Sequence, residues 1–173
     1  MARSNFGARL AAASFGGLAL LLASAPAWAQ PADQMMAAAR AGNVQAQTYL
    51  GSMYLNGAGV PQSDAMAANW FGDAAKRGDA VAQTNLGLLY QEGRGVPMNP
   101  ATAVFWYRQA AHQGNPEAET DLGELYEAGQ GVPRNFNKAI NWYRAAGKQG
   151  CAPARQNLMH LYIYMRSTHG TTG

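Results

Sequence analysis

Residues 78–113 read GDAVAQTNLGLLYQEGRGVPMNPATAVFWYRQAAHQ, and the same pattern stands immediately before and after them. A shift of 36 residues gives 16 identities between residues 42–77 and 78–113, and 18 between residues 78–113 and 114–149. A fixed period of this length is typical of solenoid proteins, in which each repeat packs only on its neighbours. The sequence therefore predicts three copies of one structural unit.

Each unit is predicted to be a helical hairpin. In residues 78–113 the apolar residues recur at helical spacing in two groups, Ala82, Leu86, Leu89 and Tyr90, and then Ala103, Trp106, Tyr107 and Ala110. Asp79 and Asn99 stand where a helix N-cap is needed, and Gly93 suits the left-handed residue that ends a helix. We expect Trp106 to fill the space between hairpins.

A glycine recurs inside the first helix of each unit, at positions 51, 87 and 123. Glycine within a helix costs about 1 kcal/mol relative to alanine. Its recurrence therefore predicts that another backbone or side chain comes very close at this point.

The run A-x-x-x-L-G-x-x-Y-x-x-G-x-G-V, followed by A-x-x-W-[FY]-x-x-A-A, resembles the Sel1-like repeat, which is related to the tetratricopeptide repeat. It is present from Ala46, from Ala82 and from Ala118, and residues 150–166 keep half of it. The resemblance implies an all-α, right-handed α/α solenoid of about three and a half hairpins. The expected division is repeats at 42–77, 78–113 and 114–149, a lead and capping helix at 30–41, a half-repeat at 150–166 and a flexible tail at 167–173.

The first 29 residues are typical of a cleavable signal peptide. Arg3 and Arg9 precede an apolar run, and Ala27 and Ala29 occupy the positions that a signal peptidase reads. The apolar run is too short for a membrane-spanning helix, which needs about 20 residues. We expect export, cleavage after Ala29, and a mature protein in the periplasm or outside the cell.

Loss of the signal peptide would leave 11 basic and 10 acidic residues, so the basic pI of 9.2 is no evidence for nucleic-acid binding. The charges are unevenly placed. Residues 30–127 hold 5 basic and 10 acidic residues, whereas residues 128–173 hold 6 basic residues and none acidic. The solenoid is therefore predicted to be electrically polar along its length.

No catalytic, cofactor or metal motif is found in the sequence. The three histidines are isolated, and the Gly-x-Gly of each unit follows a helix instead of the strand that a dinucleotide site requires. Cys151 aligns with the helix caps Asn43, Asp79 and Asn115 and is interpreted as a substituted cap, with an intermolecular disulfide as the alternative. The protein is therefore not expected to be an enzyme.

The predicted partner-binding surface lies at the C-terminal end. On the outward side of the first helix of the third unit, acidic residues recur at helical spacing, beside an unusually apolar terminal helix. A solvated helix side is the alternative reading of such a charge run. The residues predicted to contact a basic, apolar-anchored partner are Glu117, Thr120, Asp121, Glu124, Glu127, His160 and Ile163.

The expected function is that of a protein-interaction scaffold in the bacterial cell envelope, because similar exported repeat proteins act in this way. Two alternatives remain at this point. Cysteine-rich members of the family have been described as β-lactam-binding or β-lactam-hydrolysing, but they carry paired cysteines that this chain lacks. The second alternative is that the protein binds peptidoglycan or another glycan.

Overall fold

The computed structural model describes residues 29–169, and the side chains of residues 33–168. Residues 1–28, which hold nearly all of the predicted signal peptide, and residues 170–173 lie outside this range. The described part contains eight helices and no strand: α2 (Ala29–Arg40), α3 (Val44–Asn56), α4 (Asp64–Lys76), α5 (Ala80–Glu92), α6 (Pro100–His112), α7 (Pro116–Ala128), α8 (Phe136–Lys148) and α9 (Ala152–His169). Among these helices none has the length and hydropathy of a transmembrane span.

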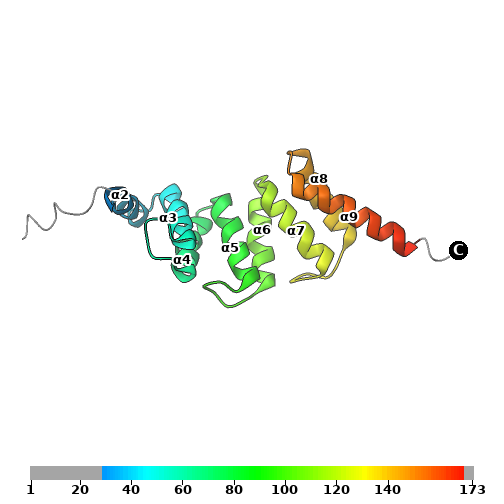
Figure 1. Cartoon of the computed structure of the whole chain (residues 1–173), viewed down its shortest axis with the longest axis horizontal. Helices are drawn as coiled ribbons and strands as arrows, with labels where there is room; N and C mark the ends of the chain where they lie inside the picture. The colour runs from blue at the N-terminus through cyan, green and yellow to red at the C-terminus, as the bar shows by residue number, and fades with distance from the viewer. Residues whose placement is uncertain (1–28, 170–173) are drawn as a thin grey trace, which may run out of the picture.

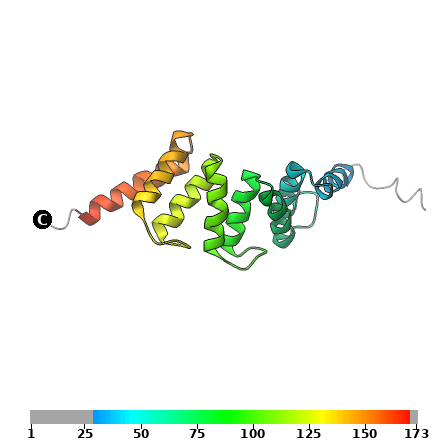
Figure 2. The ribbon, with the colours of Figure 1, turned by 180° about the vertical axis from the view of Figure 1, so that it is seen from behind.

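The helices follow one another in a single row from α2 at one end to α9 at the other (Figure 1), and the view from behind shows the same order (Figure 2). The closest packing is within the hairpins α3–α4, α5–α6 and α7–α8, and each hairpin then packs on the next. The predicted all-α solenoid is confirmed. The handedness of its superhelix stays a prediction.

Polar caps and glycines mark the helix ends as the sequence predicted. The Asp79 carboxylate accepts a hydrogen bond of 2.7 Å from the Ala82 amide, and the Asn99 side chain accepts one of 3.1 Å from the Thr102 amide. Gly93 has a φ of 70°, in the left-handed region that favours glycine. These local signals end the first helix of each hairpin (α3, α5, α7) and start the second (α4, α6, α8) at the same place in the repeat.

The glycine inside each first helix is explained by an aromatic ring. A Cβ atom at Gly87 would lie 2.8 Å from the Tyr107 ring, and one at Gly123 would lie 2.4 Å from the Tyr143 ring. Phe71 covers Gly51 in the same way, at 2.7 Å. The predicted close approach is therefore confirmed, and it brings the two helices of each hairpin together.

The tryptophan series is less buried than expected. Trp106 is only partly buried and packs against the cluster that α4 of the first hairpin and α5 of the second form together, so its predicted place between hairpins is confirmed. The adjacent Tyr107 is fully buried. The centre of each hairpin is thus filled by the residue after the tryptophan.

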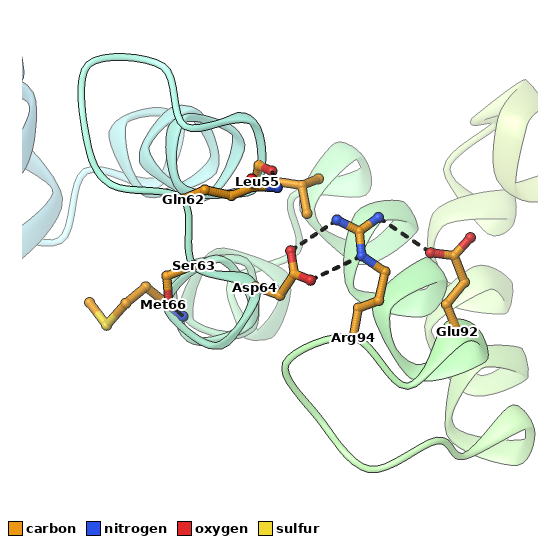
Figure 3. Close-up of polar contacts among 7 residues, drawn as sticks. All are labelled: Leu55, Gln62, Ser63, Asp64, Met66, Glu92 and Arg94. Atoms are coloured by element: carbon orange, nitrogen blue, oxygen red, sulfur yellow. Dashed lines mark hydrogen bonds and ion pairs between the residues drawn. The ribbon is translucent and has the colours of Figure 1, made fainter.

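The loop of the second hairpin reaches back to the first hairpin (Figure 3). A Cβ atom at Gly95 would lie 2.3 Å from the backbone of Asp64, so only glycine fits there. Next to it, Arg94 donates two hydrogen bonds to Asp64, of 2.9 and 3.1 Å, and a longer one of 3.4 Å to Glu92. The guanidinium lowers the pKa of the Asp64 carboxyl. At the following junction Gln130 stands in place of Arg94.

The two ends of the solenoid differ from the predicted boundaries. Helix α2 begins at Ala29, so the stretch expected to be a lead before the capping helix is itself helical, and α2 packs on α3. Helix α9 continues to His169, three residues into the segment expected to be a tail. In the repeat pattern α2 corresponds to a second helix and α9 to a first helix.

Candidate partner-binding site

An open pocket of about 450 Å³ lies at the C-terminal end of the solenoid. Helix α7 contributes Glu124, Glu127 and Ala128 to it. The following loop and α8 contribute Arg134, Phe136 and Tyr143, and α9 contributes Asn157, His160 and Tyr164. Three of the residues predicted from the sequence, Glu124, Glu127 and His160, are therefore brought together.

Two hydrogen bonds position the carboxylates of this pocket. The Tyr143 hydroxyl donates to Glu127 over 2.8 Å, and the Asn157 side-chain amide donates to Glu124 over 2.8 Å. Burial, and then the bond to Glu127, raise the pKa of the Tyr143 phenol, so it stays a donor. Each carboxylate is held by one oxygen and keeps further acceptor capacity for a ligand.

Aromatic rings form the other wall. Phe136 and Tyr164 meet edge to face, with ring centroids 5.8 Å apart. The Arg134 guanidinium lies over Phe136, 5.1 Å from the ring centroid. A cation already rests on an aromatic face of this pocket, in an arrangement that is electrostatically favourable.

Asp121 lies one turn before Glu124 and carries less charge than its residue type suggests. Its pKa is raised to about 7, mainly by burial and then by the charge of Glu124, with a smaller contribution from Glu117 and an opposing one from a hydrogen bond with the Tyr107 phenol. The acidic surface on α7 is thus weaker at neutral pH than the sequence predicted.

Thr120 does not belong to this surface, and its prediction was wrong. Its side chain is buried, donates to the carbonyl of Pro116 over 2.7 Å, and lies 3.4 Å from the sulfur of Cys151. The position faces the next unit. A signal was present in the sequence, because threonine occupies this position in all three units, as expected for a packed residue and not for a variable surface.

Two further predicted residues lie outside the pocket. Glu117 is exposed at the start of α7. Ile163 is 60% exposed on α9, whereas the neighbouring Leu161 is fully buried and Met165 packs against the last core cluster. Of the apolar residues on the terminal helix, Ile163 is therefore one that a partner could reach.

The sequence prediction missed the aromatic and basic part of the pocket, namely Arg134, Phe136, Tyr143, Asn157 and Tyr164. Tyr143 could have been found, because the position after the tryptophan is aromatic in every unit. Phe136 and Arg134 could not, since they have no counterpart of the same type in the other units. Over the residues with described side chains, no group of three or more His, Cys, Asp or Glu is placed to hold a metal ion.

The family model described as the Sel1 repeat matches residues 44–79, 80–115 and 116–151, and so covers more than half of the chain. No curated protein matches the chain. Several solved structures do.

One of these structures is a protective antigen of uropathogenic Escherichia coli with an SLR fold, 39% identical, with a TM-score of 0.76 over 78% of this chain. The match spans only 29% of the antigen's length. A Sel1 repeat protein from Oxalobacter formigenes is 37% identical, with a TM-score of 0.68 over 76% of this chain and 98% of its own. The cysteine-rich protein B of Helicobacter pylori is 22% identical, covers 72% of this chain and 95% of its own, and shares the fold with a TM-score of 0.58. On the strength of the three matched repeats, the chain belongs to the Sel1 repeat family.

Proposed function

We propose that this protein is exported and serves as a protein-interaction scaffold in the bacterial cell envelope, binding a partner at its C-terminal pocket and not acting as an enzyme. The observation that carries the proposal is the pocket itself, where Glu124 and Glu127 face an aromatic wall next to the exposed Ile163. Solenoids typically present such surfaces to partners.

The chemistry of the pocket favours a particular kind of partner segment. Carboxylates with free acceptor capacity attract lysine or arginine side chains, and the rings of Phe136 and Tyr164 can pack against the stem of such a side chain. Ile163, at 60% exposure, offers an apolar anchor on the neighbouring helix. The partner is therefore a basic segment that carries at least one large apolar residue.

Apolar anchors and rim charges contribute differently to binding. Anchors in the centre of an interface tend to dominate affinity, while charges at the rim mainly accelerate association. Reversal of Glu124 and Glu127, the two carboxylates of the pocket, to lysine should therefore slow association and weaken its dependence on salt. Ile163→Ser should chiefly speed dissociation.

The test is an affinity pull-down from an envelope fraction with mass spectrometry, using wild-type protein and a Glu124→Lys, Glu127→Lys double variant. Asp33→Lys, an exposed charge reversal on α2, is the control for non-specific charge effects. A partner that is captured by wild type and Asp33→Lys but lost with the double variant supports the proposal. Its kinetics are then measured by surface plasmon resonance at two salt concentrations. Equal capture by all three proteins contradicts binding at this pocket.

Export has its own test. Intact-mass measurement of the protein from the periplasmic fraction should give a chain that begins at Gln30. Recovery of the protein only from the cytoplasm, with residues 1–29 attached, contradicts this part of the proposal.

A further inference from the structure

A second cavity, of about 480 Å³, lies at the opposite end of the solenoid. It is lined by the end of α2 and the following loop (Ala39, Arg40, Gly42), by Gln47 of α3, and by Trp70, Asp73, Lys76 and Arg77 at the end of α4. No residue of this cavity belongs to the C-terminal pocket, so the two sites are independent.

Two buried polar atoms of this cavity have no hydrogen-bond partner. Gln47 is only 5% exposed, and while its amide nitrogen donates to the Ala39 carbonyl over 3.0 Å, its side-chain oxygen accepts no bond. The indole nitrogen of Trp70 is also buried and donates to nothing. Buried polar groups in native proteins are nearly always paired, so an unpaired acceptor and an unpaired donor on residues that line the same cavity call for an explanation.

The other repeats show what is different here. The oxygen of Gln83 accepts from the side chain of Gln113 over 2.8 Å, and Glu119 accepts from Gln149 over 2.9 Å. The residue at the equivalent position in the first repeat is Arg77. Its guanidinium donates to the Gly42 carbonyl over 2.6 Å and makes no hydrogen bond to the Gln47 oxygen.

Glycine permits this altered arrangement. A Cβ atom at Gly42, which has a φ of 89°, would lie 2.8 Å from an Arg77 nitrogen, whereas nothing lies within 4 Å of the corresponding position at Gly78 or Gly114. The Arg77 contact is thus particular to the first repeat. It leaves the Gln47 side-chain oxygen without a partner and leaves the other N–H groups of the guanidinium for a ligand.

The charges of the cavity favour an anion. Arg40, Lys76 and Arg77 are cationic, and Asp73 is the one carboxylate, 3.9 Å from Lys76 in a largely exposed pair. Within the part of the chain that is described, neither Arg40 nor Arg77 has a carboxylate partner. Inorganic phosphate would also suit the cations and the indole N–H, and near neutral pH it keeps one or two O–H groups that could donate to Gln47, so it is the competing ligand in the test below.

We propose that this cavity binds the free C-terminal end of a peptide or protein. The terminal carboxylate lies against the guanidinium groups of Arg40 and Arg77 and accepts from the Trp70 indole, and the amide N–H of the last residue donates to the Gln47 oxygen. An N–H next to a carboxylate offers a donor for the Gln47 oxygen, an acceptor for the Trp70 indole and a negative charge for the arginines in one fragment. Arginine forks suit carboxylates because they offer two parallel N–H groups.

The test compares N-acetyl-Ala-Ala-Ala carrying a free carboxylate with the same peptide carrying a C-terminal amide. Binding to the purified protein is followed by calorimetry and by the indole N–H resonance of Trp70 in a two-dimensional NMR spectrum. The acid should bind and shift that resonance, and the amide should bind at least about tenfold more weakly, since a charge-assisted pair is lost. Equal binding of acid and amide, or no binding of either, overturns the proposal without any variant being needed.

Variants locate the site. Arg77→Gln installs the residue of the other two repeats, so it should pair with Gln47, close the cavity and weaken binding of the acid at least about tenfold. Arg155→Gln is the matched control, because Arg155 donates to the carbonyl of Gly150, the residue equivalent to Gly42, at the far end of the chain. That variant should bind like wild type, and unchanged binding by Arg77→Gln overturns the proposal.

Two further arms identify the source of the carboxylate. Inorganic phosphate that competes as well as the peptide would assign the cavity to simple anions, and N-acetylalanine that binds as tightly would assign it to small acylated amino acids; either result overturns the peptide assignment. The Glu124→Lys, Glu127→Lys variant should bind the acid peptide normally. Failure at this cavity is thereby distinguished from failure at the C-terminal pocket.

Discussion

The first and third hairpins share one backbone design but present different surfaces. In the first, the buried ring is Phe71, which has no hydroxyl group. The positions that correspond to Glu127 and Glu124 of the third hairpin are Leu55 and Ser52. In the third, the ring is Tyr143, whose hydroxyl bonds to Glu127, and Glu124 stands where Ser52 does. The residues that pack a hairpin are thus separable from those that give it chemistry, and the chemistry is concentrated at the two ends.

The largest expected effect tests whether the ring is equally important in both hairpins. Phe71→Ala and Tyr143→Ala should each lower the free energy of unfolding by about 3–5 kcal/mol, because each removes a fully buried aromatic side chain. Trp142→Ala should cost clearly less, since Trp142 is only partly buried. Urea unfolding followed by circular dichroism measures all three, and a Trp142 variant as unstable as the Tyr143 variant would contradict this assignment of the core.

The second-largest change in stability is expected from the glycine that the ring covers. Gly123→Ala should destabilise the fold by about 1–3 kcal/mol, the usual cost of overpacking, because its Cβ would lie 2.4 Å from the Tyr143 ring. Gly72 lies inside α4 with nothing within 4 Å, so Gly72→Ala should stabilise by about 0.5–1 kcal/mol through helix propensity. The two substitutions should therefore shift the unfolding midpoint in opposite directions; shifts of the same sign would count against close ring packing.

A third experiment concerns the acidic surface that only the third hairpin has. The pKa of Asp121 is about 7 in the folded protein and about 3.9 in an unfolded chain, so between pH 4 and 7 the folded state holds a proton that the unfolded state releases. The contribution of the Asp121 carboxyl to the free energy of unfolding therefore falls as the pH rises from 4 to 7. Asp121→Asn should therefore equal wild type near pH 4 and exceed it by about 2 kcal/mol at pH 8, allowing for partial solvent screening.

The measurement is the difference between the two unfolding free energies at several pH values, in which the titration of other groups largely cancels. Asn is also the residue at the equivalent position of the second hairpin, Asn85, so the substitution introduces nothing foreign to the fold. A difference that does not change with pH would show that Asp121 is an ordinary exposed carboxylate.

The smallest effect belongs to the junction between the first two hairpins. Arg94→Gln copies Gln130 of the next junction and removes the ion pair with Asp64. Because the pair is partly exposed, we expect only a slight loss of stability, present at low salt and absent at high salt. Thermal unfolding at two ionic strengths checks this, and a large loss that salt does not reduce would point to a packing role for the arginine stem.

The fold could be predicted largely from the sequence because its decisive signals are local. Asp79 and Asn99 cap helices, and Gly93 ends one, with geometry that depends on a few neighbouring residues. Repetition strengthened these signals, since the same residues had to satisfy the same packing three times. The recurrence of glycine at 87 and 123 even predicted a close contact before its partner was known.

The candidate sites were harder to predict because they depend on contacts between units. The burial of Thr120 follows from how the next unit covers α7, and helical spacing within α7 alone placed it on the open side. Helical spacing likewise could not tell whether Trp106 or Tyr107 fills the centre of the hairpin. Tyr107 is the fully buried one, whereas Trp106 packs against the cluster formed by α4 and α5. The cavity at Gln47 results from one substitution, Arg77 for glutamine, whose effect on hydrogen bonding appears only in three dimensions.

The described chain begins with a helix of the second kind, α2, and ends with one of the first kind, α9. Because the repeats share one period, the boundary of a duplicated segment can fall at any point of the 36 residues without changing the junctions on either side. A gene with this property can grow or shrink by whole periods through recombination between its own repeats, while both terminal helices keep their neighbours. Length is thus a variable that such a protein can change in one genetic step, independently of the chemistry at its ends.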